Sequence, residues 1–214
     1  EVEIGAYFRE GNGIAAEDID GSWPCFRGAE GENIAGGGVA LSESWEADEP
    51  EVLWTVSVGE GHAGAAVHKG RVYVLDYNED AQRDALRCLS LKDGEEIWRR
   101  SYDVKVQRNH GMSRTVPAVS DSYVVSLGPK GHVMCADAGT GDLLWGIDLV
   151  RDYGSTVPMW YTGQCPRIDD GVAVLAPAGD RALMIGVECR TGEVLWETPN
   201  PEELEMSHSS VMPA

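Results

Sequence analysis

Short runs of apolar residues alternate with turn residues along most of the chain. Three runs rich in β-branched residues each follow a turn and span Val72–Leu75, Tyr123–Leu127 and Val172–Leu175. Segments rich in small residues precede two of them, at Ala63–Val67 and Thr115–Val119. Short β-branched runs bounded by turns are typical of strands, and no segment keeps the helical period of 3.6. The pattern predicts an all-β chain.

Tryptophan recurs at the end of a repeated motif. In three segments a glycine precedes a tryptophan by four residues, as Gly94 and Trp98, Gly141 and Trp145, and Gly192 and Trp196. Glycine there can adopt the positive φ that a tight hairpin requires. Trp54 matches the outgoing strand without the turn, so the tryptophans are 44, 47 and 51 residues apart. This is the period of a propeller blade, and a sandwich with unrelated tryptophans is the weaker alternative.

The pattern in each repeat therefore predicts four short antiparallel strands. The repeats together predict a β-propeller with about three and a half blades. The repeats end near Trp98, Trp145 and Trp196, and residues 202–214 resemble the first strand of a fourth blade. A propeller needs at least about four blades to close. We therefore expect the N-terminal half of a ring of about seven or eight blades, in which the strand of Trp54 completes the last blade. Open blade edges predict a dimer, or completion by the missing blades.

Charge and cysteine content limit the partners. The 214 residues carry a formal net charge of −19, which disfavours nucleic acid and anionic membrane surfaces as partners. No apolar stretch is long enough to span a membrane. The five cysteines form no CxxC pair, so we expect no zinc site, and Cys88 and Cys135 occupy equivalent repeat positions that predict small buried strand residues. Because residue 1 is Glu, either a leader has been removed or the chain begins inside a longer one.

Four equivalent stretches should line one mouth of the propeller channel, namely 60–64, 108–114, 159–164 and 206–210. They contain cations, donors and aromatic rings, which suit a polar or planar ligand. The alternative is that these are polar channel residues in contact with ordered water. The predicted ligand-binding residues are His62, Arg108, His110, Arg114, Trp160, Tyr161, Gln164 and His208.

Two further groups of polar residues suggest solvated surface. The acidic run Asp76–Asp80, followed by Asp84, suggests calcium, but it lacks the EF-hand glycine and terminal glutamate, so we favour a solvated loop and predict no metal site. His68 and His132 fall next to turns, and we expect both to be solvated loop residues.

Two motifs resemble a known family. Asp137–Trp145 is close to the D-A-x-T-G-x-x-x-W ending of blades in the pyrroloquinoline-quinone-like (PQQ-like) β-propellers, and Trp23–Gly28, with Gly31 after it, looks like the W-P-x-F-R-G entry of secreted bacterial members. The resemblance implies an N-terminal acidic extension over residues 1–22, a lead-in segment over 23–49 and propeller blades over 50–214. It also implies an extracytoplasmic location in a bacterium.

The resemblance allows three functions. The one we favour is a non-catalytic binding or scaffolding propeller of the cell envelope, similar to family members in outer-membrane protein assembly, with a protein, glycan or small molecule at the mouth. The second is a PQQ- and calcium-dependent quinoprotein alcohol dehydrogenase, in which Trp160, Arg108 and Arg114 hold the cofactor; the adjacent cysteines of such enzymes are absent, and no catalytic aspartate can be assigned. The third is a glycan- or small-molecule-binding propeller that uses Trp160, Tyr161 and His208. One fold hosts many functions, so the motifs alone do not choose.

Overall fold

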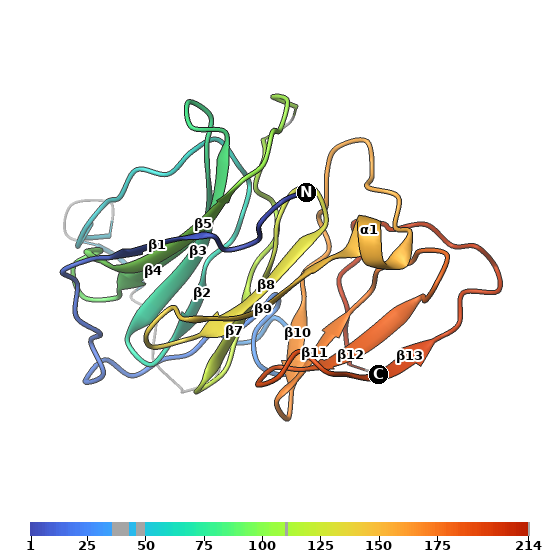
Figure 1. Cartoon of the computed structure of the whole chain (residues 1–214). Coiled ribbons are helices and arrows are strands. Elements are labelled where there is room, and N and C mark those ends of the chain that lie inside the picture. Colours follow the sequence, from blue (N-terminus) through green and yellow to red (C-terminus); the bar gives the residue numbers. More distant parts are fainter. Residues whose placement is uncertain (36–42, 46–49, 110, 214) are drawn as a thin grey trace.

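The computed structural model describes residues 1–35, 43–45, 50–109 and 111–213. Its strands form three antiparallel sheets that stand side by side (Figure 1). Blade 1 has the order β1-β5-β4-β3-β2, blade 2 the order β6-β7-β8-β9 and blade 3 the order β10-β11-β12-β13. The predicted all-β class and the four-stranded antiparallel repeat are confirmed, and the structure is a partial propeller of three blades.

The strand bounds agree closely with the apolar runs. In blade 1 they are β1 Tyr7–Glu10, β2 Ala66–His68, β3 Arg71–Asn78, β4 Arg83–Ser90 and β5 Glu96–Asp103. In blade 2 they are β6 Ala118–Val119, β7 Tyr123–Leu127, β8 His132–Asp137 and β9 Leu143–Asp148. In blade 3 they are β10 Arg167–Asp169, β11 Val172–Leu175, β12 Met184–Glu188 and β13 Val194–Thr198.

One short helix, α1 (Leu149–Tyr153), follows β9 and was not predicted. Its ends explain why it forms. The Asp148 side chain accepts hydrogen bonds from the amides of Val150 and Arg151, and Gly154 ends the helix with φ of 69°. These are standard helix caps, but five residues are too few to show a helical period in the sequence.

Three tryptophans join consecutive structural units in the same way. The indole Nε1 of Trp98 donates to the carbonyl of Ala138 at 3.2 Å, and that of Trp145 donates to the carbonyl of Cys189 at 2.8 Å. Trp54 makes the same bond to Leu91 at 2.9 Å. Each acceptor lies three residues before the glycine of a blade turn, and each indole packs on that glycine: Trp54 on Gly94, Trp98 on Gly141 and Trp145 on Gly192.

The core consists of two apolar layers between the blades. Blades 1 and 2 enclose Tyr73, Leu86 and Trp98 with Met134. Blades 2 and 3 enclose a second cluster that includes Leu127, Trp145, Leu149, Leu175 and Ile185. Because each blade buries one face against the next, the apolar area removed from water lies mainly between blades, and this burial stabilises their packing.

The strand expected around Trp54 does not form. Residues 50–59 have no regular secondary structure and belong to no sheet. Side chains hold this segment on blade 1 instead: Arg87 donates to the carbonyl of Ser57 at 2.9 Å, and the amide of Gly59 donates to Asp76 at 2.6 Å. A strand needs a hydrogen-bonded neighbour, and the described part of the chain provides none here.

The first ten residues lie along the outer edges of the blades. β1 pairs with β5 and gives blade 1 its fifth strand. Before β1, Ile4 packs against Gly146 of β9, and Glu1 forms an ion pair with Arg151 at 2.8 Å. Residues predicted as an extension therefore contact β5 of blade 1, β9 of blade 2 and the helix α1.

Candidate functional site

Each of the four stretches predicted to line the channel mouth lies in space beside the next one along the chain. We call these stretches together the mouth; they comprise residues 60–64, 108–114, 159–164 and 206–210, of which residue 110 is not described. The amide of His62 donates to the carbonyl of Ser113 at 2.7 Å, and the amide of Met112 donates to the carbonyl of Glu60 at 3.2 Å. Asn109 Nδ2 donates to the carbonyl of Met159 at 3.1 Å. Backbone atoms therefore fix how these loops lie against one another.

The last stretch continues this arrangement. His208 Nε2 lies 3.1 Å from the carbonyl oxygen of Tyr161, and the amide of Cys165, just after the third stretch, donates to Ser210 Oγ at 3.0 Å. Gly163 lies so close to the His208 ring that an added Cβ would be 2.4 Å from Cδ2. The mouth is thus one continuous surface made of loops from all three blades and the C-terminal segment.

The structure divides the predicted ligand-binding residues into three groups. Exposed residues are His62, Arg108, Trp160 and His208, and Arg114 is half-buried. Tyr161 and Gln164 are buried, at 7% and 4% exposure. His110 lies outside the described residues.

The two buried residues already use their polar atoms. Tyr161 Oη donates to the carbonyl of Gln107 at 2.6 Å, and Gln164 Nε2 donates to the carbonyl of Ala176 at 2.7 Å. A buried donor with a satisfied hydrogen bond stabilises the fold and is costly to redirect. Their observed contacts hold the loops of the mouth in place.

Arg108 is the exposed arginine of the mouth, and its guanidinium group forms an ion pair with Glu60. Its Nη2 lies 2.7 Å from Glu60 Oε2. The hydrogen bond to Glu60 raises the pKa of Arg108. An anionic ligand would therefore have to compete with Glu60, which lies in the predicted stretch 60–64 but is not one of the predicted ligand-binding residues.

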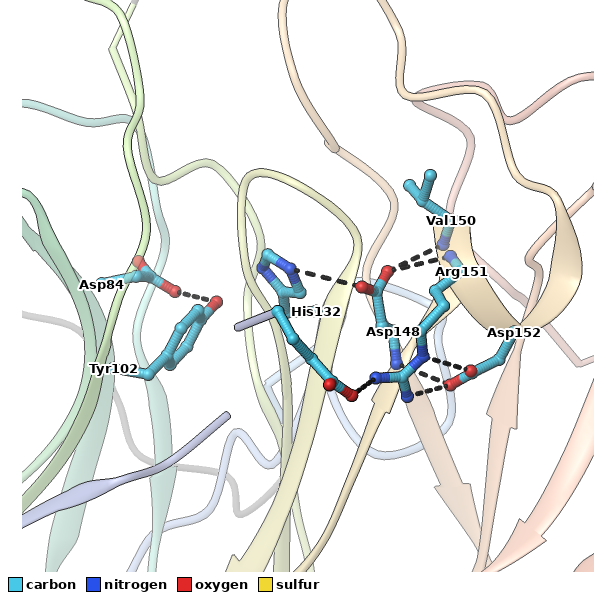
Figure 2. Close-up of polar contacts among 8 residues, drawn as sticks. Asp84, Tyr102, His132, Asp148, Val150, Arg151 and Asp152 are labelled. Carbon is cyan, nitrogen blue, oxygen red and sulfur yellow. Dashed lines mark hydrogen bonds and ion pairs between the residues drawn. The ribbon is translucent and has the colours of Figure 1, made fainter. Parts of the chain in front are cut away.

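A buried polar cluster lies beneath the mouth, between blades 1 and 2. Tyr102 Oη donates to Asp84 Oδ2 at 2.9 Å, and Ser113 Oγ donates to Asp84 Oδ1 at 3.4 Å (Figure 2 shows Asp84 and Tyr102). Burial raises the pKa of Asp84 to about 7, although both hydrogen bonds lower it. Gly128 of blade 2 covers the pair so closely that a Cβ would lie 2.1 Å from Tyr102 Oη, so only glycine fits there.

His132 extends this cluster and corrects a prediction. Its ring packs edge-on against Tyr102, with centroids 5.3 Å apart, and its Nε2 lies 3.8 Å from Asp148 Oδ2 (Figure 2). The residue begins β8 and is 6% exposed, so the expectation of a solvated loop histidine is wrong. Burial lowers the pKa of His132 despite the nearby carboxylate, which favours the neutral ring. His68 ends β2 and is half-buried, 2.8 Å from Asp121.

The acidic run is also not a solvated loop throughout. Asp76 lies in β3 and Asp84 in β4, and both are buried. Asp76 accepts from Arg87 at 3.1 Å, and Arg87 also pairs with Glu96 at 2.8 Å. These carboxylates belong to ion pairs and hydrogen bonds that need both partners.

A calcium–PQQ site would make demands on the side chains of the mouth. Among the described residues, no group of three or more His, Cys, Asp or Glu side chains could hold a metal ion. Calcium needs about six to eight oxygen ligands, and the exposed arginine of the mouth is already paired with Glu60.

No helix in the described part of the chain is long and apolar enough to cross a membrane.

A family model described as outer membrane protein assembly factor BamB, of the PQQ_2 type, matches residues 82–214. The chain belongs to this PQQ-repeat family. The match covers the three turn-and-tryptophan motifs, so the resemblance inferred from those motifs is confirmed. A search of curated proteins finds no match.

Three of the solved structures that resemble this PQQ-repeat chain are larger enzymes. A europium-containing methanol dehydrogenase has a TM-score of 0.57 and 17% identity, over 84% of this chain and 32% of that one. Quinohemoprotein alcohol dehydrogenases from Comamonas testosteroni and Pseudomonas putida HK5 both have a TM-score of 0.54, with 18% and 20% identity, over 85% of this chain and 29% and 27% of theirs. The chain thus spans about a third of their length, and likeness at this identity shows the fold.

Sequence reasoning missed the cluster beneath the mouth of this PQQ-repeat chain. Asp84 corresponds in the repeat to Gly131 and Ala182, and Tyr102 corresponds to Leu149. A carboxylate at a position that is small and apolar in the other two blades was the available signal. It becomes visible only after the repeats are aligned strand by strand.

Proposed function

We propose that the chain is a non-catalytic binding or scaffolding β-propeller of the bacterial cell envelope, located outside the cytoplasm, and that a protein partner binds its mouth. Family membership supports the scaffolding class. One observation at the mouth supports the protein partner: Met159 and Trp160 are adjacent and remain 80% and 47% exposed.

The surroundings of this pair favour a protein over a small ligand. Methionine, tryptophan and arginine are enriched in protein interfaces, and tryptophan often dominates the binding energy. Cations flank the pair, since Asn109, next to Arg108, contacts Met159, and Lys130 lies over the Tyr161 ring at 5.1 Å. On a chain with a net charge of −19, Lys130 is a local positive charge beside this apolar tip, whereas Arg108 is paired with Glu60. The pair therefore suits a partner with apolar side chains and an acidic group that faces Lys130.

The glycan hypothesis has less support. Of its three proposed contact residues, Tyr161 is buried and its hydroxyl is bonded to Gln107. Trp160 and His208 remain exposed, and one indole with one imidazole gives few oriented donors for a sugar.

The dehydrogenase hypothesis stays as the second candidate because the similar solved structures are quinoprotein enzymes. It would require cofactor ligands beyond the residues described here. If such a group bound, it would supply the redox chemistry, and Trp160 and Arg108 would contact it.

Two measurements separate these proposals. Site-specific photo-crosslinking from position 160 in the envelope of the producing bacterium should give one defined protein adduct, and the same probe at position 45, where Trp45 is 51% exposed, should not. Calorimetric titration with PQQ, with and without calcium, should give no saturable heat. Saturable, calcium-dependent binding that Trp160→Ala abolishes would favour the dehydrogenase, and equal adducts from positions 45 and 160 would remove the mouth as the interface.

A further inference from the structure

Two cysteines face each other across the contact between blades 2 and 3. Cys135 lies in β8, and Cys189 follows β12 directly in the turn that receives Trp145. Both side chains have 0% exposure and belong to the same apolar cluster. The chain brings together residues 54 positions apart, so the contact exists only when the two blades are packed.

The Cys135 thiol lies against Cys189, and both cysteines are free in the structure. Cys135 Sγ lies 3.4 Å from the carbonyl oxygen of Cys189. The side chains also interact with each other, since a hydrogen bond between them raises the pKa of Cys135 and lowers that of Cys189. A disulfide between them would bring the sulfur atoms to about 2.05 Å from each other.

The blade repeat positions this pair. Trp145 pairs with Cys135 across β8 and β9 and donates its indole hydrogen bond to the carbonyl of Cys189 at 2.8 Å. The same indole bond thus holds the backbone of residue 189 beside Cys135. In the repeat, Cys189 corresponds to Ala138 in blade 2 and Leu91 in blade 1, so the equivalent contact between blades 1 and 2 has a thiol on one side only, from Cys88.

We propose that Cys135 and Cys189 form a disulfide bond that joins blade 2 to blade 3 when the chain folds under oxidising conditions. The reaction is thiol–disulfide exchange with a small-molecule disulfide. One thiolate attacks the external disulfide and releases its first thiol, and the second thiolate then displaces the other. The two cysteines lose two electrons and two protons in total, and the external disulfide becomes two thiols. The extracytoplasmic location above would supply such conditions in the cell, but the pairing itself does not depend on it.

The other three cysteines provide internal controls. Cys88 lies against Tyr73 and Arg71, and no other thiol contributes to its environment. Cys25 Sγ donates to the carbonyl of Gly28 at 3.2 Å, and Cys165 Sγ accepts from the amide of Val116 at 3.2 Å. Burial raises the pKa of Cys25, and the nearby Cys165 adds to this effect, so these two thiols are the pair with which the Cys135–Cys189 link has to be compared.

The test is to refold the chain in a buffer of reduced and oxidised glutathione and to map its cysteines by non-reducing peptide mass spectrometry. We expect one linked peptide pair that contains Cys135 and Cys189, lighter by two hydrogens than the reduced peptides. Oxidation while the chain is kept in urea should scatter the links among the cysteines. The linked protein should melt on the order of 10 °C above the reduced protein, because a loop of this length loses unfolded-state entropy when closed.

Variants make the result decisive. Cys189→Ala copies the residue that blade 2 has at the equivalent position, so it should fold, lose the linked pair and melt at the same temperature with or without reductant. Cys88→Ala is the matched control and should keep both the link and the reductant-dependent melting temperature. The proposal is wrong if native refolding leaves Cys135 and Cys189 free to alkylate, caps them with glutathione, or links either of them to Cys25, Cys88 or Cys165.

Discussion

At the start of β5, Trp98 packs on Gly141 of blade 2 and donates to the carbonyl of Ala138, whereas four residues later on the same strand Tyr102 binds the buried carboxyl of Asp84 beneath Gly128. The two residues join the same two blades by different means. The indole contact recurs at the next blade pair with Trp145. The carboxyl contact does not recur, because blade 2 has Gly131 and Leu149 at the equivalent positions.

The tryptophan contact and the Asp84 contact have different effects on how the blades pack. A repeated apolar contact with one hydrogen bond stabilises any pair of adjacent blades. It therefore contributes stability but does not determine which two blades pack together. A buried carboxyl is costly unless its partners are in place. Tyr102 belongs to the same blade as Asp84, but Ser113 and the covering Gly128 come from later in the chain, so the site favours the blade pairing that brings these two residues to it. We infer that the tryptophan contact stabilises the blades and that the Asp84 contact specifies which blades meet.

The largest effect should come from Trp98→Ala. The side chain is 1% exposed between two blades, and deletion of a buried aromatic side chain costs about 3–5 kcal/mol of unfolding free energy. Urea unfolding followed by far-ultraviolet circular dichroism would measure it. A loss below about 1 kcal/mol would show that the indole contact does not hold the blades together.

A pH-dependent effect should come next, from Asp84. Its pKa is raised to about 7 by burial, so the folded chain holds this proton more tightly than the unfolded chain. The stability of the wild type relative to Asp84→Asn should therefore be highest near pH 4 and fall by up to about 1.4 kcal/mol per pH unit up to about pH 7.

Urea unfolding of both proteins at several pH values would test this, since the other carboxylates cancel in the difference. Tyr102→Phe sharpens it, because the hydrogen bond from Tyr102 lowers the pKa of Asp84 and its loss should move the decline to higher pH. If the difference in unfolding free energy between the two proteins did not change between pH 4 and 8, the Asp84 carboxyl would not be shielded from water.

A smaller effect should follow from Gly141→Ala. A Cβ there would lie 2.6 Å from the Trp98 ring, and φ is +75°. We expect a loss of about 2–3 kcal/mol, the sum of a clash and an unfavourable backbone. Gly171→Ala is the matched control, with φ of +77° and nothing within 4 Å, and should lose only about 1 kcal/mol. Equal losses at the two positions would show that the ring does not press on the turn.

The smallest effect should come from Trp196→Ala, since this indole is 40% exposed at the outer strand of blade 3. It should cost less than about 1.5 kcal/mol in the same urea assay. A loss as large as that of Trp98→Ala would mean that blade 3 is covered in solution, for instance by a second copy of the chain.

The sequence predicted those features that repeat. Three glycine–tryptophan motifs and three β-branched runs were enough for the blades, because each strand is local and each tryptophan has the same surroundings. Asp84 and His132 were misjudged for the opposite reason. Their burial depends on which blade lies next to them, and no local pattern of apolar and polar residues contains that information.

The mouth was predicted only in part. Repeat alignment predicted that its four stretches lie together, and they do contact one another, since equivalent loops of adjacent blades meet; that they bind a ligand stays a prediction. The alignment could not distinguish the exposed Trp160 from the buried Tyr161. The two residues are adjacent, and the local backbone conformation decides which ring points outward. Tyr161 has a φ of 66°, which turns the chain at that point. Glu60 was passed over because its pairing with Arg108 joins two different loops.

The strand β1 has a consequence for how these chains can associate. It covers the outer edge of β5, while β13 has β12 as its one neighbour among the described strands and exposes Leu195 and Trp196. A molecule with one open edge can pair with a second copy into a closed dimer, whereas a molecule with two open edges can add copies at both ends without limit. β1 does not close the edge of blade 1 but replaces it, since β5 is its one neighbour among the described strands. Blades 1 and 3 therefore both keep an open outer strand, and residues 7–10 make the outer strand of blade 1 only four residues long, which is one way in which proteins weaken pairing at an edge.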